Sequence, residues 1–178
     1  PRFFVSPYIE YTLFTPDTVN GQETFQHGGQ GVVGCDVLAN LHPVIISFRF
    51  KGSIPDKNKE LNEDTGELEI EAESSNRSGL TNSLELSYKY SEHLTFLVSG
   101  EAEYSSESDR KDPENGLPWG GRLFRYALGP GIGYAPNKTI SINGQAMYVY
   151  YHEHENARFS SEITVQGVTC AVSITYRP

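Results

Sequence analysis

Residues 84–104 read LELSYKYSEHLTFLVSGEAEY, which is two alternating runs joined by a short polar turn. In the first run Leu84, Leu86 and Tyr88 are separated by polar residues, and a similar alternation resumes at Phe96. A period of two places apolar side chains on one face of a β-strand and polar side chains on the other. The stretch therefore predicts an antiparallel hairpin whose two faces differ in polarity.

The same pattern recurs along the chain and predicts eight strands, at 3–14, 30–41, 43–53, 79–90, 94–105, 121–135, 139–153 and 162–176. The connections after the second, fourth and sixth strands are short, whereas the other four are longer and polar, at 15–29, about 54–78, 106–120 and 154–161. This asymmetry predicts an up-and-down antiparallel meander with both termini at the short-turn end. Eight such strands suffice to close a small barrel, so we expect one all-β domain over residues 1–178.

Composition excludes several classes of protein. The 178 residues include 14 Lys and Arg against 23 Asp and Glu, a net charge of −9, which argues against a nucleic-acid-binding face. No apolar run approaches the roughly 18 residues of a membrane-spanning helix. Cys35 and Cys170 are too few for a disulfide framework, and we interpret them as free thiols.

Two kinds of barrel have this alternation: a soluble barrel with its apolar face inside, and a membrane barrel with that face toward lipid. The polar face mixes small residues with charges of both signs, which suits a narrow interior filled by side chains. Tyrosines gather near the strand ends of the apolar face, as at lipid–water boundaries. We therefore predict a transmembrane barrel with an interior polar and ion-pair core made by Glu10, Asp36, Arg49, Glu85, Lys89, Glu101, Glu103 and Arg125.

The strand count, the turn and loop asymmetry and the last strand, GVTCAVSITY at 167–176, together resemble the small eight-stranded outer-membrane barrels of Gram-negative bacteria, the architecture of the OmpA transmembrane domain, OmpX and OmpW. The chain departs from their pattern by ending Tyr176-Arg177-Pro178 instead of on a terminal Phe. A change of phase near Gly167 suggests a β-bulge in the last strand. The resemblance implies a location in the bacterial outer membrane, short periplasmic turns and long extracellular loops. Roles in this class include anchoring, adhesion, transport of small apolar molecules and membrane integrity.

The long loop at about 54–78 is strongly acidic. Its residues Asp56, Asn58, Glu60, Asp64 and Glu67 approximate the ligand spacing of a calcium loop, although Leu61 stands where such a loop has glycine. The hypothesis of a Ca²⁺ site competes with that of a solvated acidic loop. Within the loop, residues 67–73 alternate and predict a strand that extends the hairpin.

A second candidate for metal binding is the pair His152 and His154, which share a face if the seventh strand continues through them. They would bind zinc or copper if a neighbouring strand supplied a third ligand. The alternative is a rim of solvated side chains.

These features predict a non-enzymatic protein, since no nucleophile motif accompanies the histidines. We expect it to act in anchoring, adhesion, partner binding or membrane integrity, with outer-membrane lipids and lipopolysaccharide around it, no nucleic acid, and a protein partner at its loops. Divalent cations would bridge acidic loop residues to lipid phosphates. Two alternatives stay open: a soluble calycin-like carrier of a small hydrophobic ligand, and a lipid-modifying enzyme that uses His152 or His154.

Overall fold

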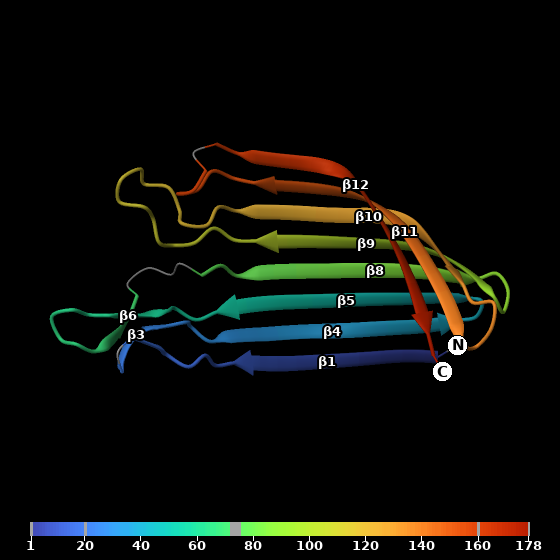
Figure 1. Cartoon of the computed structure of the whole chain (residues 1–178), viewed down its shortest axis with the longest axis horizontal. Helices are drawn as coiled ribbons and strands as arrows, with labels where there is room; N and C mark the ends of the chain where they lie inside the picture. The colour runs from blue at the N-terminus through green and yellow to red at the C-terminus, as the bar shows by residue number, and fades with distance from the viewer. Residues whose placement is uncertain (1, 20, 72–75, 160, 178) are drawn as a thin grey trace.

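The computed structural model describes residues 2–19, 21–71, 76–159 and 161–177. The chain is all-β, and its main element is a sheet of eight antiparallel strands in the order β1-β4-β5-β8-β9-β10-β11-β12 (Figure 1). These strands are β1 Arg2–Thr12, β4 Gln30–Leu41, β5 Val44–Pro55, β8 Gly79–Lys89, β9 Leu94–Ser105, β10 Leu123–Tyr134, β11 Ile140–Glu153 and β12 Ile163–Tyr176.

The predicted meander is confirmed, because each strand of the main sheet pairs with the predicted segment that follows it in the chain. Figure 1 shows both chain ends at the end of the sheet where β4 turns into β5, as the loop asymmetry predicted. The described residues contain no helix that is long and apolar enough to cross a membrane.

A second, smaller sheet lies within the long loops and was not predicted. Its four strands are β2 Asp17–Val19, β3 Gln22–Gln26, β6 Lys59–Leu61 and β7 Leu68–Ile70, in the order β2-β3-β6-β7. The strand predicted at 67–73 corresponds to β7 in part, and its last residues lie outside the described ranges. β7 pairs with β6 within the β5–β8 connection, so the predicted extension of that hairpin is present in part. The additional pairing of β6 with β3 of the first loop was not predicted.

The register of the main sheet keeps residues of one kind in line from edge to edge. A row on one face runs through Val5, Val37, Phe48, Leu84, Gly100, Leu128, Tyr148 and Val168. The next row, on the other face, runs through Ser6, Asp36, Arg49, Ser83, Glu101, Ala127, Val149 and Gly167. We call these two surfaces the apolar face and the polar face.

The bulge predicted at Gly167 is absent. Gly167 pairs with Val149, and the register between β11 and β12 continues without a shift from Ile163 to Tyr176. Gly167 lies on the polar face, so the alternation keeps its phase through it. The apparent change of phase arises because Thr164 and Gln166 stand on the apolar face at the loop end of the strand.

The apolar face is exposed. Each of the eight strands presents at least one exposed large apolar side chain there, and Ile9, Leu128 and Val168 are 82%, 56% and 69% exposed. In the described part of the chain, the only buried hydrophobic residues are Val32, Ala39 and Ala127. The sheet therefore has no hydrophobic core of its own, and its largest apolar surface needs a cover from outside the fold.

The sheet is open in this structure, with β1 and β12 at its edges, whereas the sequence predicted a closed barrel. Both edge strands are exposed along almost their whole length. Within the described ranges, no backbone pairing joins β1 to β12. What the structure establishes is thus the antiparallel eight-stranded sheet and the separation of its faces.

Close packing on the polar face leads to a prediction about two glycines. A Cβ atom at Gly129 would lie 1.8 Å from the carbonyl oxygen of Ala146, whereas a Cβ at Gly167 would meet nothing within 4 Å. Both glycines lie on the polar face. We expect Gly129→Ala to lower the free energy of unfolding by about 1–3 kcal/mol, because β10 and β11 must separate locally.

Equilibrium unfolding in urea measures this change, and Gly167→Ala is the matched control. Equal stability of the two variants would contradict the close approach of β10 and β11 at Gly129.

Candidate functional site

All eight residues predicted for the interior polar core lie on the polar face of the main sheet. Two groups of them form ion pairs. Arg49 donates to Asp36 across β4 and β5 at 2.7 Å. On β9 and β10, Arg125 lies 2.9 Å from Glu101 and 3.6 Å from Glu103.

The other three members of that predicted core stand apart. No ion pair among the described residues includes Glu10, Glu85 or Lys89. The ion pairs that do form are partly exposed, because the sheet is open above them. Ion pairs in contact with water are screened and stabilise a fold only weakly, so a closed interior is needed for a large effect.

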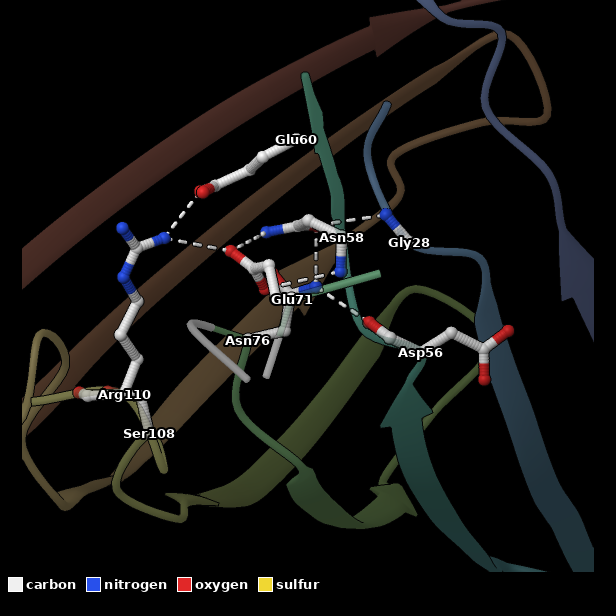
Figure 2. A network of polar contacts seen from close by, with 8 residues as sticks. All are labelled: Gly28, Asp56, Asn58, Glu60, Glu71, Asn76, Ser108 and Arg110. Atoms are coloured by element: carbon white, nitrogen blue, oxygen red, sulfur yellow. Dashed lines mark hydrogen bonds and ion pairs between the residues drawn. The ribbon is translucent and has the colours of Figure 1, made fainter. Parts of the chain in front are cut away.

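The densest polar contacts lie at the loop end of the molecule, around the carboxylate of Glu71 (Figure 2). The side chain of Glu71 is only 3% exposed. Its Oε1 accepts a hydrogen bond from Arg110 at 3.1 Å and one from the side-chain amide of Asn58 at 3.3 Å. Its Oε2 accepts from the backbone N–H of Asn58 at 3.3 Å. A buried charge is thus balanced by a cation and by two neutral donors.

Asn58 carries the network toward the first loop. Its Oδ1 accepts from the backbone N–H of Gly28 at 2.9 Å and from the side chain of Asn76 at 2.8 Å. The Asn76 amide also donates to the carbonyl of Asp56 at 2.8 Å. A Cβ at Gly28 would lie 2.2 Å from that same carbonyl oxygen, so only glycine allows the two loops this approach.

Arg110 comes from the third long loop and lies between two acids and an indole. It hydrogen-bonds to Glu60 as well as to Glu71, and its guanidinium carbon lies 5.1 Å from the ring centre of Trp119. The hydrogen bond that Arg110 donates to Glu60 raises the pKa of Arg110 above its ordinary value. A raised pKa means that the folded state favours the charged guanidinium. The contact with Glu60 therefore contributes its full stabilisation at every pH below the pKa that Arg110 has in the unfolded chain.

Ser108 holds the backbone that presents Arg110. The residue is 1% exposed, and its hydroxyl donates to the carbonyl of Arg110 at 3.2 Å while it accepts from the N–H of Gly120 at 2.9 Å. The N–H of Trp119 donates to the carbonyl of Arg110 at 3.0 Å. The third loop is therefore folded back on itself before it reaches Glu71.

Further contacts tie in the fourth long loop. Arg77 donates to the carbonyl of Gly121 at 2.7 Å and lies 3.6 Å from Glu153, at the end of β11. The N–H of Ala157 donates to the carbonyl of Pro118 at 2.9 Å. All four long loops are thus joined by hydrogen bonds into one cap, which we call the loop cap. No buried side-chain nitrogen or oxygen of the described residues lacks a hydrogen-bond partner.

The five residues of the calcium hypothesis do not converge. The Asp56 carboxylate accepts from the Tyr11 hydroxyl, Asn58 and Glu60 belong to the contacts of Glu71 and Arg110, and Asp64 and Glu67 lie at the turn between β6 and β7. A calcium loop needs its oxygen ligands around one point. The structure therefore does not bring these five residues around one point, and Arg110 already supplies a cation to Glu60.

The two histidines of the other metal hypothesis do lie together. The rings of His152 and His154 are 4.9 Å apart at the end of β11. Glu162, directly before β12, approaches within 3.0 Å of His154. Among the described residues, these three are the only group of His, Cys, Asp and Glu with ligand atoms close enough to share a metal ion.

Sequence reasoning missed the Glu71 network, although both of its charges were visible in the sequence. The excess of acids in the second loop was the available signal, because a long acidic loop needs cations and Arg110 with Trp119 stands in the next loop. The contact joins residues 39 positions apart, and no local pattern encodes such a separation.

The fold and the loop cap define this chain as an all-β protein with a long antiparallel meander and a hydrogen-bonded cap at one end. Comparison with protein-family models, with curated proteins and with solved structures finds no match. The exposed apolar face of the sheet and the loop cap are therefore the features that bear on function.

The Glu71 network predicts an effect of removing its cation. Arg110→Ala removes the guanidinium group from a nearly buried carboxylate, so we expect the local opening free energy of the loop cap to fall by about 1.5–3 kcal/mol. Backbone amides in 56–71 should then exchange hydrogen about ten- to a hundredfold faster.

Hydrogen exchange followed by mass spectrometry measures this rate. Arg122→Ala is the matched control on the same loop, because Arg122 lies 3.9 Å from Glu107 and both side chains are more than half exposed. The network would be refuted by equal exchange rates in the two variants.

Proposed function

We propose that this chain is a non-enzymatic β-barrel of the bacterial outer membrane, with its eight long strands in the lipid and its loop cap outside as a rigid platform for partners. The observation that carries the proposal is the exposed apolar face, which extends over all eight strands while charges and small residues line the opposite face. Hydrocarbon is the cover that suits an apolar surface of this extent.

The distribution of aromatic residues supports a lipid cover over a soluble one. Tyr88, Tyr90, Tyr134 and Tyr176 lie near the short-turn end of the strands, and each is about half exposed or more. Tyrosine favours the boundary between hydrocarbon and water, since its ring is apolar and its hydroxyl is polar. A soluble carrier would instead enclose the apolar face around its ligand, whereas Ile9, Leu128 and Val168 on that face are 82%, 56% and 69% exposed.

The edge strands support closure in the membrane. Backbone groups along the free edges of β1 and β12 need hydrogen-bond partners, and each unpaired group in hydrocarbon costs several kcal/mol. Pairing of β1 with β12 removes both edges at once. It also encloses the polar face, so the ion pairs of Arg49 and Arg125 become interior contacts and strengthen. The small residues Ala127 and Gly129 suit the narrow interior of an eight-stranded barrel.

The loop cap supports a role in binding or membrane integrity. Its long loops are fastened by contacts from Gly28 to Asn58 and from Arg110 to Glu71, so the cap presents a fixed surface. Preorganised loops bind a partner with less loss of conformational entropy. Several exposed acids of the second loop, Glu63, Asp64, Glu67 and Glu69, remain outside the ion pairs found in the described ranges. Divalent cations bridge such carboxylates to the phosphates of lipopolysaccharide.

Heat-modifiability tests the membrane barrel. We expect the protein refolded in detergent to run as a compact, fast band on an SDS gel without boiling, and to shift after boiling, because a closed barrel unfolds slowly in SDS. We also expect it to precipitate in buffer without detergent, since the apolar face is then uncovered. A monomer that stays soluble in plain buffer and does not shift would instead favour the carrier.

A cysteine scan tests closure directly and uses Cys170, which is exposed on the apolar face of β12. In a Cys35→Ser background, single cysteines are placed on the apolar face of β1, at Phe3, Val5, Pro7 and Ile9. In a closed barrel β1 is the neighbour of β12, so we expect a disulfide with Cys170 at one or two successive positions, where Cα atoms approach to about 5.5–6 Å.

The controls are Ser6→Cys, which lies on the polar face of β1, and Phe48→Cys, which lies on β5. Neither should cross-link, because the first side chain points inside the barrel and the second is two strands farther from β12. Non-reducing gels and mass spectrometry report the bond. A scan in which no position on β1 reacts would mean that the sheet stays open.

A further inference from the structure

We infer that His152, His154 and Glu162 form a binding site for one divalent transition-metal ion, zinc or copper, at the loop end of β11 and β12. Their ligand atoms all lie within 4.8 Å of one another. The site is separate from the Glu71 network and requires neither a closed barrel nor a membrane.

The main-chain geometry brings the three residues together. His152 is in β11, and His154 follows two positions later on the same side of the extended chain. Glu162 lies immediately before β12, the strand that pairs with β11. The Oε1 atom of Glu162 lies 3.0 Å from Nδ1 of His154. Two ligands close in sequence and a third from the returning strand are a frequent way to build a metal site on a hairpin.

The distances suit a small adjustment toward coordination. Zinc bonds of about 2.0–2.2 Å place tetrahedral ligand atoms roughly 3.4 Å from each other. The ligand atoms here are no more than 4.8 Å apart, and His154 and Glu162 are about half exposed, so rotation of their side chains closes the gap. Three protein ligands leave a fourth position open to water.

A second contact orients His152. Its Nδ1 lies 2.9 Å from the hydroxyl of Thr164, which is its partner across the β11–β12 ladder. This contact leaves Nε2 as the nitrogen that is available to a metal, and such outer contacts fix the orientation of histidine ligands in metal sites.

The turn that carries Glu162 back is held at its start by Asn156, which is 3% exposed. Its Oδ1 accepts from the N–H groups of Arg158 at 2.9 Å and Phe159 at 3.1 Å, and its amide donates to Glu153 at 3.0 Å. The approach of Glu162 to the histidines therefore begins from an ordered turn.

The chemistry of the set selects the class of metal. Imidazole nitrogen suits zinc and copper, whereas calcium and magnesium take oxygen ligands. Two histidines with one carboxylate are a common zinc set.

Calorimetric titration of the full-length folded protein with ZnCl₂ tests the site, with Co²⁺ absorption as a second readout of coordination geometry. We expect one ion per chain. His154→Ala and Glu162→Gln should each lower the affinity at least about tenfold, since loss of even an outer-shell contact costs 10–100-fold. His42→Ala, in the short turn at the opposite end, is the matched control and should leave the affinity unchanged.

His154→Gln provides a second variant that keeps a hydrogen-bonding side chain, and circular dichroism verifies that each variant is folded. The proposal is overturned if the His154 and Glu162 variants bind zinc as tightly as the His42 control. It is also overturned if Zn²⁺ binds no more tightly than Mg²⁺, because acidic loop residues then account for the binding.

Discussion

The in-phase register of eight antiparallel strands is the constraint on which the rest of this structure depends. Side chains alternate along a strand with a period of two, so a slip of one residue in any pairing exchanges the two faces. The rows of paired residues keep their phase from β1 to β12, and Val5 lies in line with Leu84 and Val168. One surface of the sheet is therefore apolar except near its loop end, where Thr164 and Gln166 stand, and Asp36, Arg49 and Glu101 share the other surface.

This separation of faces determines where the sheet finds its stability. A soluble sheet stacks its apolar side against another layer, and burial of that area is the main favourable term in folding. Here the described residues provide no second layer, and the buried hydrophobic residues are as small as Val32 and Ala127. The backbone ladder and the contacts of the polar face hold the strands in register, while the environment has to supply the hydrophobic term. Under the proposed function the cover of the apolar face is membrane lipid, so the stability of the sheet and its proposed location depend on each other.

The strands, the turns and the two faces of the sheet could be predicted from the sequence. All three are encoded locally, by the alternation of apolar and polar residues and by residues such as Pro43 and Asn137 in the short connections. The predicted ends of all eight long strands lie within about two residues of the observed ends. Different assignment methods disagree about the ends of elements by a similar margin. Contacts between loops were not predictable in the same way. Glu71 and Arg110 meet only because the sheet brings the second and third loops to one end, and β2 and β3 are too short to produce an alternating pattern. The bulge at Gly167 was misjudged, since polar residues at the rim of the apolar face imitate a change of phase.

The contrast between the two ends of the sheet has a physical cause. Short turns such as the one at His42 leave few backbone groups to be satisfied, so local contacts such as that of the Ser91 hydroxyl with the N–H of His93 suffice at that end. Long loops leave many polar backbone groups without ladder partners, and these groups must be hydrogen-bonded if the loops are to be ordered. The side chain of Asn58 accepts a hydrogen bond from the backbone N–H of Gly28, and that of Ser108 accepts one from Gly120. The carboxylate of Glu71 accepts from the backbone N–H of Asn58 and from the Arg110 guanidinium. Separating a buried acid from a cationic partner is costly, so the interactions that order these loops also hold them in a single arrangement. A cap of fixed shape therefore supports the proposed role in partner binding, because preorganised loops lose less conformational entropy when a partner binds.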